Sequence, residues 1–338
     1  MNANRTLLLN ALSKVHGIDV YLTYRCDMRC SHCFVGPRLG QRNLPYPHLG
    51  NLLEACAQTG VHEVTYLGGE PTLYPRIDDA LRDAWARGLE VRIVSNGMGG
   101  LSRLLDRLDP LDGPLHICLS LDGDRDAHDS IRRPGAYEAI QRVAERCHQM
   151  GIPLSGITSV SRDNVEQVES IVRDSDRLGF THLNLHYVSA RGFATAETVL
   201  SAQEWDEVRR RVTLLTAEVR LPIRFEDTFV PAGRDVRCVV KHESNLMFFP
   251  DGKVFHCALF IDVPDGHSFE FTGEDLERAS APTSERCVVQ SGAKAGCPVA
   301  SRVYDDDVIA GIPDLCCNCI YDKTVLKDGL RQADFRGH

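Results

Sequence analysis

Residues 26–33 read CDMRCSHC, so that Cys26, Cys30 and Cys33 form the pattern C-x3-C-x2-C. Random placement of the chain's 13 cysteines among 338 residues would produce this pattern about 0.02 times. Three thiolates at this spacing can bind three irons of a four-iron cluster and leave the fourth iron open to an exogenous ligand. A structural zinc site is the alternative, because His32 offers the fourth ligand that zinc requires.

On both sides of this stretch, short apolar segments alternate with amphipathic segments of helical length. Ala136–Met150 and Val165–Leu178 are two of the predicted helices. Six such βα units predict a parallel sheet, either an open doubly wound sheet or an incomplete barrel. The predicted strands are Asp19–Thr23, Glu63–Leu67, Glu90–Val94, Leu115–Leu119, Leu154–Ser159 and His182–Tyr187.

Polar motifs follow the second, third and fourth predicted strands at the point where each strand ends. In parallel α/β folds this edge of the sheet binds ligands. Taken singly, each motif is also typical of a simple turn or a solvated surface charge. The motifs are Gly68-Gly69-Glu70-Pro71, Ser95-Asn96-Gly97 and Ser120-Leu121-Asp122-Gly123, followed by Arg132-Arg133-Pro134-Gly135.

Together, the cysteine loop and these motifs resemble the radical S-adenosylmethionine (SAM) enzymes over residues 18–190. The resemblance implies a partial (β/α)6 TIM-like barrel, a [4Fe-4S] cluster on Cys26, Cys30 and Cys33, and SAM as cosubstrate. It implies that the GGE motif holds the methionine amino group of SAM and that His32 stacks on the adenine. The residues of the GGE motif are Gly68, Gly69 and Glu70, and contacts with the ribose and carboxylate of SAM are expected from Ser95, Asn96, Ser120, Asp122 and Arg132.

The C-terminal third contains seven of the 13 cysteines. Cys238 and Cys257 flank a predicted hairpin, Asn245–Cys257, that turns at Pro250–Gly252. This spacing resembles the SPASM and Twitch domains, which hold auxiliary iron–sulfur clusters. Cys238, Cys257, Cys316 and Cys319 match a Twitch domain with one auxiliary [4Fe-4S] cluster, the preferred assignment. Two auxiliary clusters are the alternative, which would add Cys287, Cys297 and Cys317.

The expected domain organisation follows from these patterns. Residues 1–17 form an N-terminal extension, residues 18–200 the radical SAM core, and residues 222–338 a small cysteine-rich auxiliary-cluster domain. A capping box at Ser201 and Glu204 predicts a linking helix over 201–221, ending near Val219. Cys56, Cys118 and Cys147 are expected in the core. The expectation for His186, Tyr187, Glu226 and Asp227 is a structural role in hydrogen bonding.

Composition limits the possible partners. The chain is 43% hydrophobic and 25% charged, and its 38 basic and 47 acidic residues give a net charge of −9. Without a basic surplus, no nucleic-acid partner is expected. The sequence has no membrane-length apolar run and no signal peptide, so a cytoplasmic location is expected.

The resemblance also implies a reaction. Reduction by a donor such as flavodoxin or ferredoxin would cleave SAM, and the resulting radical would abstract hydrogen from a small-molecule substrate. Only about 17 residues precede the first strand, which leaves no room for an N-terminal peptide-recognition domain. The preferred hypothesis is therefore a dehydrogenase-type oxidoreductase of antibiotic biosynthesis that oxidises a secondary alcohol of a sugar, aminocyclitol or nucleoside.

Several alternatives stay open. A redox-neutral epimerase would need a thiol as hydrogen donor, for which Cys287, Cys297 and Cys317 are the candidates. A sugar-acid decarboxylase would need no such donor. Peptide or protein maturation is a further enzymatic alternative, and an iron–sulfur sensor or electron carrier is the non-enzymatic one.

Overall fold

The computed structural model describes residues 6–109, 112–231, 238–280, 315–317, 321 and 323–326. Of the predicted site residues, Cys287, Cys297 and Cys319 lie outside these ranges. For Cys316 and Cys317 the description covers the backbone alone.

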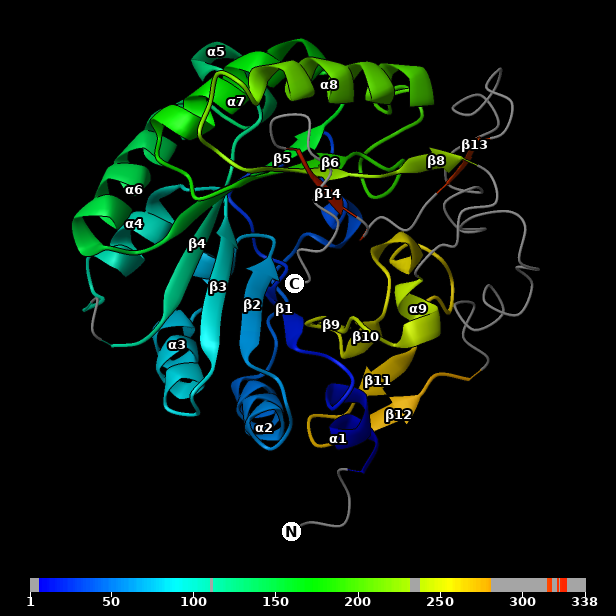
Figure 1. Cartoon of the computed structure of the whole chain (residues 1–338). Helices are drawn as coiled ribbons and strands as arrows, with labels where there is room; N and C mark the ends of the chain where they lie inside the picture. Colours follow the sequence, from blue (N-terminus) through cyan, green and yellow to red (C-terminus); the bar gives the residue numbers. More distant parts are fainter. Residues whose placement is uncertain are drawn as a thin grey trace.

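Six parallel strands, each followed by helical segments, form a partial (β/α)6 barrel (Figure 1). Each predicted strand coincides with an observed one, and the helices cover the outside of the curved sheet as right-handed crossovers require. The incomplete-barrel interpretation is therefore confirmed. The strands are β1 Gly17–Thr23, β2 Glu63–Gly68, β3 Glu90–Ser95, β4 Leu115–Ser120, β5 Leu154–Val160 and β6 Leu183–Tyr187.

The helices follow the expected pattern with small differences at their ends. Ser201 Oγ accepts from the Glu204 amide at 3.2 Å in a complete capping box. The helix ends at Leu215, and the amide of the C-cap residue Thr216 donates to Thr213 O in a tight final turn. The helices are α1 Thr6–Leu12, α2 Tyr46–Ala57, α3 Ile77–Trp85, α4 Gly99–Leu105, α5 Arg125–Ile131, α6 Ala136–Met150, α7 Val168–Arg177, α8 Ala202–Leu215 and α9 Val239–His242.

The region after residue 222 continues the same sheet at both edges. The predicted hairpin forms from β9 and β10 and turns at Gly252, and β9 runs parallel to β1. At the other edge β7 lies parallel to β6 and pairs antiparallel with β14. The strands are β7 Ile223–Glu226, β8 Phe229–Pro231, β9 Met247–Phe248, β10 Lys253–Phe255, β11 Phe269–Phe271, β12 Leu276–Arg278, β13 Leu315–Cys317 and β14 Lys323–Leu326.

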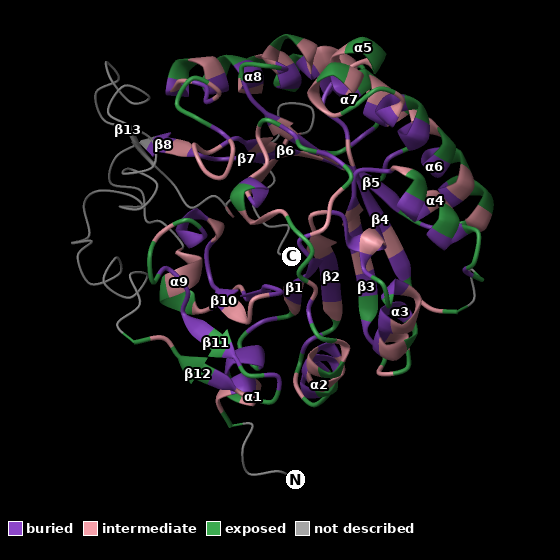
Figure 2. Ribbon diagram, turned by 180° about the vertical axis from the view of Figure 1, so that it is seen from behind, coloured by how far each residue is buried: buried purple, intermediate pink, exposed green. Residues whose placement is uncertain are grey.

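Burial alternates along the barrel strands (Figure 2). In β3, Val91 and Ile93 are 1% and 0% exposed beneath the helices, whereas Arg92 between them is half-buried on the inner face. Because side chains alternate across a strand, one face forms the apolar core and the other lines the barrel lumen. In the described part of the chain, no helix has the length and apolar character needed to span a bilayer.

Candidate active site

Two glycines at the end of β2 bring that strand against the cysteine loop. The Gly69 amide donates to Thr23 O at 2.8 Å, and the Glu70 amide donates to Arg25 O at 2.7 Å. A Cβ atom on Gly69 would lie 2.3 Å from Arg25 O and 2.9 Å from the Cys26 side chain. The glycine therefore permits an approach of the two backbones that other residues would block.

Glu70 is a buried hydrogen-bond acceptor that joins the ends of β2 and β3. Its Oε1 accepts from the Thr72 amide at 3.2 Å, from Thr72 Oγ1 at 2.6 Å and from Ser95 Oγ at 2.9 Å. Its Oε2 accepts from the Asn96 amide at 2.9 Å. Burial raises the pKa of Glu70, and these hydrogen bonds oppose the shift. Oε2 keeps acceptor capacity for one more donor, which fits the ammonium of SAM.

Asn96 connects the end of β3 to the cysteine loop. Its Nδ2 donates to Asp27 Oδ1 at 2.8 Å, and its Oδ1 accepts from the Met98 amide at 2.9 Å. Arg133 also donates to the Asp27 carbonyl, at 3.1 Å. Asn96 and Arg133 thus both hold the loop at Asp27, and both polar atoms of the Asn96 side chain have hydrogen-bond partners.

A buried ion pair follows β4. Arg132 Nε donates to Asp122 Oδ2 at 2.6 Å, and the Asp122 side chain is fully buried. Burial alone would raise the pKa of Asp122, but Arg132, with His32 and His128 nearby, holds it below its usual range. Arg132 has further N–H donors beyond this pair, and Ser120, the last residue of β4, is half-buried.

His32 lies beside this ion pair and has one nitrogen without a hydrogen-bond partner among the described residues. Its Nε2 lies 3.7 Å from Asp122 Oδ2, and its side chain is 7% exposed. Its Nδ1 is buried and has no hydrogen-bond partner among the described residues. Burial lowers the pKa of His32, so the ring is neutral at physiological pH. A buried neutral imidazole with one open nitrogen fits contact with a planar ligand such as adenine.

The three cysteines of the loop share an apolar environment. Cys30 is buried, Cys26 and Cys33 are half-buried, and all three are free thiols. Met28 and Met98 pack among them. Burial raises the pKa of Cys26 to about 12 and that of Cys33 to about 11. The thiols are therefore protonated without metal, and ligation of iron must release their protons. Three thiols in a largely apolar environment fit an iron–sulfur cluster.

The segment after β6 closes over the cysteine loop, a contact that the sequence analysis missed. The Phe193 amide donates to Cys33 O at 3.0 Å. Gly192 has φ +68°, and a Cβ atom there would lie 2.3 Å from Cys33 O. The only sequence signal is one glycine after the last barrel strand, and such glycines are common in loops.

The polar lumen was also missed, although strand alternation predicts it. Alternate residues of the barrel strands face inward, and many of these are polar, whereas their neighbours under the helices are mostly apolar. These lumen residues are Asp19, Thr65, Arg92, His116, Ser155, Asn184, His186, Arg224 and Glu226.

Two residues that were assigned structural roles lie together in this lumen. His186 Nδ1 is 3.7 Å from Glu226 Oε2, and His186 Nε2 is 2.9 Å from Lys323 Nζ. Nearby, Asp227 accepts from Arg209 and Thr324 in the structural role that was predicted for it. The Tyr187 hydroxyl donates to Leu200 O, which is also a structural contact.

The proposed auxiliary ligands are only partly described. Cys238 precedes α9 and is half-buried, and Cys257 ends the hairpin and is buried. The backbone of Cys316 lies opposite Val230 in the pairing of β13 with β8. The four-cysteine site therefore remains a prediction. Cys56, Cys118 and Cys147 are buried, as predicted.

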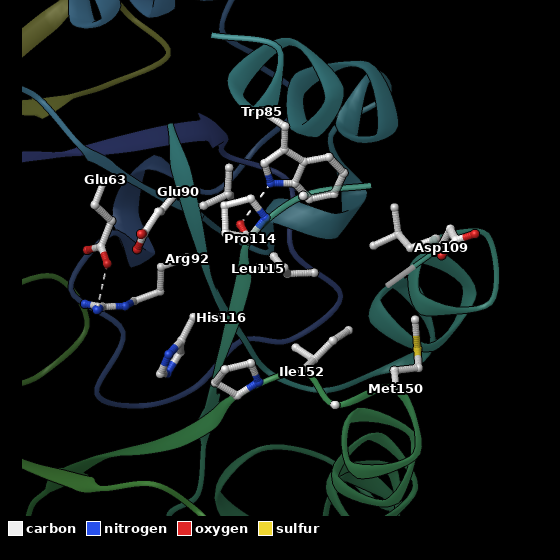
Figure 3. A pocket seen from close by; sticks show the side chains of 15 residues that line it. Glu63, Trp85, Glu90, Arg92, Asp109, Pro114, Leu115, His116, Met150 and Ile152 are labelled. Atoms are coloured by element: carbon white, nitrogen blue, oxygen red, sulfur yellow. Dashed lines mark hydrogen bonds and ion pairs between the residues drawn. The ribbon is translucent and has the colours of Figure 1, made fainter. Parts of the chain in front are cut away.

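A cavity at the opposite end of the barrel is a separate feature (Figure 3). It lies where strands β2 to β4 begin, and Trp85 Nε1 closes one side by donating to Pro114 O at 2.9 Å. Glu63, Arg92 and His116 also line it. Because parallel βα folds carry their chemistry where strands end, this cavity is not the candidate active site.

Comparisons with known proteins agree with this geometry. Residues 20–175 match the family model of the radical SAM superfamily. The PqqA peptide cyclase of Ruegeria pomeroyi is 29% identical over 254 residues, which cover 72% of this chain and 67% of that protein. An AdoMet-dependent heme synthase of Oleidesulfovibrio alaskensis is 27% identical over 198 residues, covering 55% of this chain and 50% of that protein.

Solved structures share the fold. Streptococcus suis SuiB bound to the precursor peptide SuiA matches with a TM-score of 0.64 and 17% identity, covering 90% of this chain and 67% of that chain. SuiB bound to S-adenosylmethionine matches with a TM-score of 0.62 and 17% identity, covering 74% of this chain. In that complex, the matched part is 62% of the SuiB chain.

Proposed function

We propose that this chain, whose residues 20–175 match the radical SAM superfamily, is a radical SAM enzyme that matures a peptide or protein side chain. The cofactors of the superfamily are a [4Fe-4S] cluster and SAM, which sets aside the zinc site and the non-enzymatic carrier. A reductant such as flavodoxin or ferredoxin is the expected protein partner.

The relationship to PqqA peptide cyclase, over 72% of this chain, carries the proposal of a peptide substrate. The fold shared with SuiB, which was solved with a precursor peptide, supports it. A carbohydrate-like substrate, oxidation of a secondary alcohol and a role in antibiotic biosynthesis find no support in these relatives. The peptide-maturing alternative therefore replaces them as the leading hypothesis.

Each element of the candidate site has a distinct task in this proposal. Cys26, Cys30 and Cys33 would hold the cluster, and Met28 would help exclude water from it. Glu70 would orient the ammonium of SAM through Oε2 while fixing the ends of two strands. When bound and reduced, the cluster and SAM supply hydrogen-atom abstraction, and the chain supplies orientation and a dry site.

The test is coexpression with peptides encoded beside the gene, followed by anaerobic turnover with SAM. Deoxyadenosine should form, and mass spectrometry should find a peptide lighter by one hydrogen molecule, the change expected for a new intramolecular bond. The Cys26→Ala, Cys30→Ala, Cys33→Ala triple variant is the control and should form neither product. Turnover of sugars with unchanged peptides would overturn the proposal.

A further inference from the structure

Three titratable side chains meet at the edge of the lumen where β6 and β7 end. His186 lies between the other two, with Nε2 at 2.9 Å from Lys323 Nζ and Nδ1 at 3.7 Å from Glu226 Oε2. Lys323 and Glu226 are direct cross-strand partners of β14 and β7, so their side chains share one face of the sheet. This is the edge at which parallel barrels carry their chemistry.

The three side chains differ in their exposure to solvent. The His186 side chain is 31% exposed and that of Glu226 only 3%. Lys323 is half-buried. Glu226 accepts from the Tyr187 amide at 3.2 Å and from Thr228 Oγ1 at 3.3 Å, which fixes the carboxyl group behind the histidine. A molecule in the lumen would therefore donate its proton to Lys323 or His186, and Glu226 would be the final proton acceptor.

We propose that Lys323, His186 and Glu226 form a relay that accepts a proton from the substrate. This inference rests on the proposed function, because closing a bond between two parts of a peptide releases one proton and one electron in addition to the abstracted hydrogen atom. The electron would go to an iron–sulfur cluster as a one-electron acceptor, and the proton would go to the relay. Lys323 Nζ gives a proton to His186 Nε2 and takes one from the substrate X–H bond, whose electron pair stays on X. His186 Nδ1 passes its proton to Glu226 Oε2, after an approach of about 0.5 Å to hydrogen-bond distance.

Electrostatics favours transfer in this direction. Burial raises the pKa of Glu226 to about 8, which places it near the operating pH of a general base. Burial lowers the pKa values of Lys323 and His186, so both release protons readily. The charged and titratable groups that face the relay from neighbouring elements are Asp19, Cys118, His182, Arg224 and Asp227.

The first test needs no substrate. Infrared difference spectra of the reconstituted full-length protein, wild type minus Glu226→Gln, should contain a carboxylic-acid band that disappears as the pH rises through about 8. A band that has already disappeared by about pH 5, as for an ordinary glutamic acid, would overturn the relay.

The second test measures how much peptide product forms for each deoxyadenosine. Glu226→Gln and His186→Gln should lower the ratio of peptide product to deoxyadenosine by about 10²-fold or more, the usual loss of a general base. The wild-type ratio should rise with pH through about 8 and lose this dependence in Glu226→Gln. Glu63→Gln, which changes a carboxylate of the cavity at the opposite end of the barrel, should retain the ratio.

The two tests separate the two proposals. An infrared titration near pH 8 without any peptide conversion would contradict the proposed function. It would still support proton binding by Lys323, His186 and Glu226. Peptide conversion with an unchanged ratio in both relay variants would overturn the relay alone.

Discussion

Glu70 and Glu226 are both buried carboxyl groups whose pKa values burial raises, yet their surroundings differ. Glu70 accepts four hydrogen bonds, three of them at Oε1. Glu226 accepts two long ones, at 3.2 and 3.3 Å. Because hydrogen bonds to a carboxylate stabilise its charged form, Glu70 is suited to a fixed anchoring role and Glu226 to a change of protonation.

Glu70→Gln tests the anchoring role. An amide nitrogen at the ε2 position would face the Asn96 N–H, so one buried donor would lose its acceptor. We expect a loss of about 1–3 kcal/mol in the free energy of unfolding, measured by urea titration of the iron-free protein. SAM affinity of the reconstituted protein, measured by calorimetry, should fall about 10–100-fold.

The control for this change is Glu54→Gln, at an exposed ion pair with Arg87, which should change stability by less than about 0.5 kcal/mol. Loss of SAM binding with wild-type stability would mean that Glu70 serves the ligand alone. Unchanged SAM affinity would leave it a purely structural residue.

At the scale of elements, the barrel strands were predictable because apolar runs and turn signals are local. The close contact between Gly192 and Cys33 was not, because residues 159 positions apart meet only in the fold. The same holds for His186 and Lys323, which are separated by 137 positions. Polar motifs at strand ends predicted where the candidate site lies, but not that Asp122 and Arg132 pair with each other.

Gly69→Ala tests how the end of β2 positions the cysteine loop. The new methyl group would lie 2.3 Å from Arg25 O, so the loop backbone must move away. We expect loss of the cluster bound by this loop, seen as about four fewer irons per chain after reconstitution.

Gly50→Ala is the matched control, because Gly50 lies within α2 and a Cβ atom there meets nothing within 4 Å. This change should leave iron content unaltered and raise the free energy of unfolding by about 0.5–1 kcal/mol. Full iron retention in Gly69→Ala would show that the loop tolerates displacement.

At the scale of the molecule, the C-terminal region is joined to the barrel by backbone pairing at both edges, through β9 beside β1 and β14 beside β7. Lys323 of the barrel lumen comes from this region, so a residue of the proposed relay depends on the C-terminal chain. Sequence patterns predicted a small auxiliary-cluster domain over residues 222–338 because the region is rich in Gly, Pro, Asp and Cys, and this domain assignment stays a prediction. Strand pairing between distant segments has no local signal.

The number of clusters in the whole chain is the last prediction. One cluster on Cys26, Cys30 and Cys33 and one auxiliary cluster should give about eight irons per chain after anaerobic reconstitution, and two auxiliary clusters about twelve. Replacing Cys238 and Cys257 together with alanine should remove about four irons and leave the first cluster in place, because the barrel strands β1 to β6 pair without that region. Substrate-free deoxyadenosine formation should then persist, since Glu70 and its partners are untouched. An iron content in this double variant equal to that of the wild type would remove Cys238 and Cys257 from the ligand set, and only about four irons in the wild type would exclude an auxiliary four-iron cluster altogether.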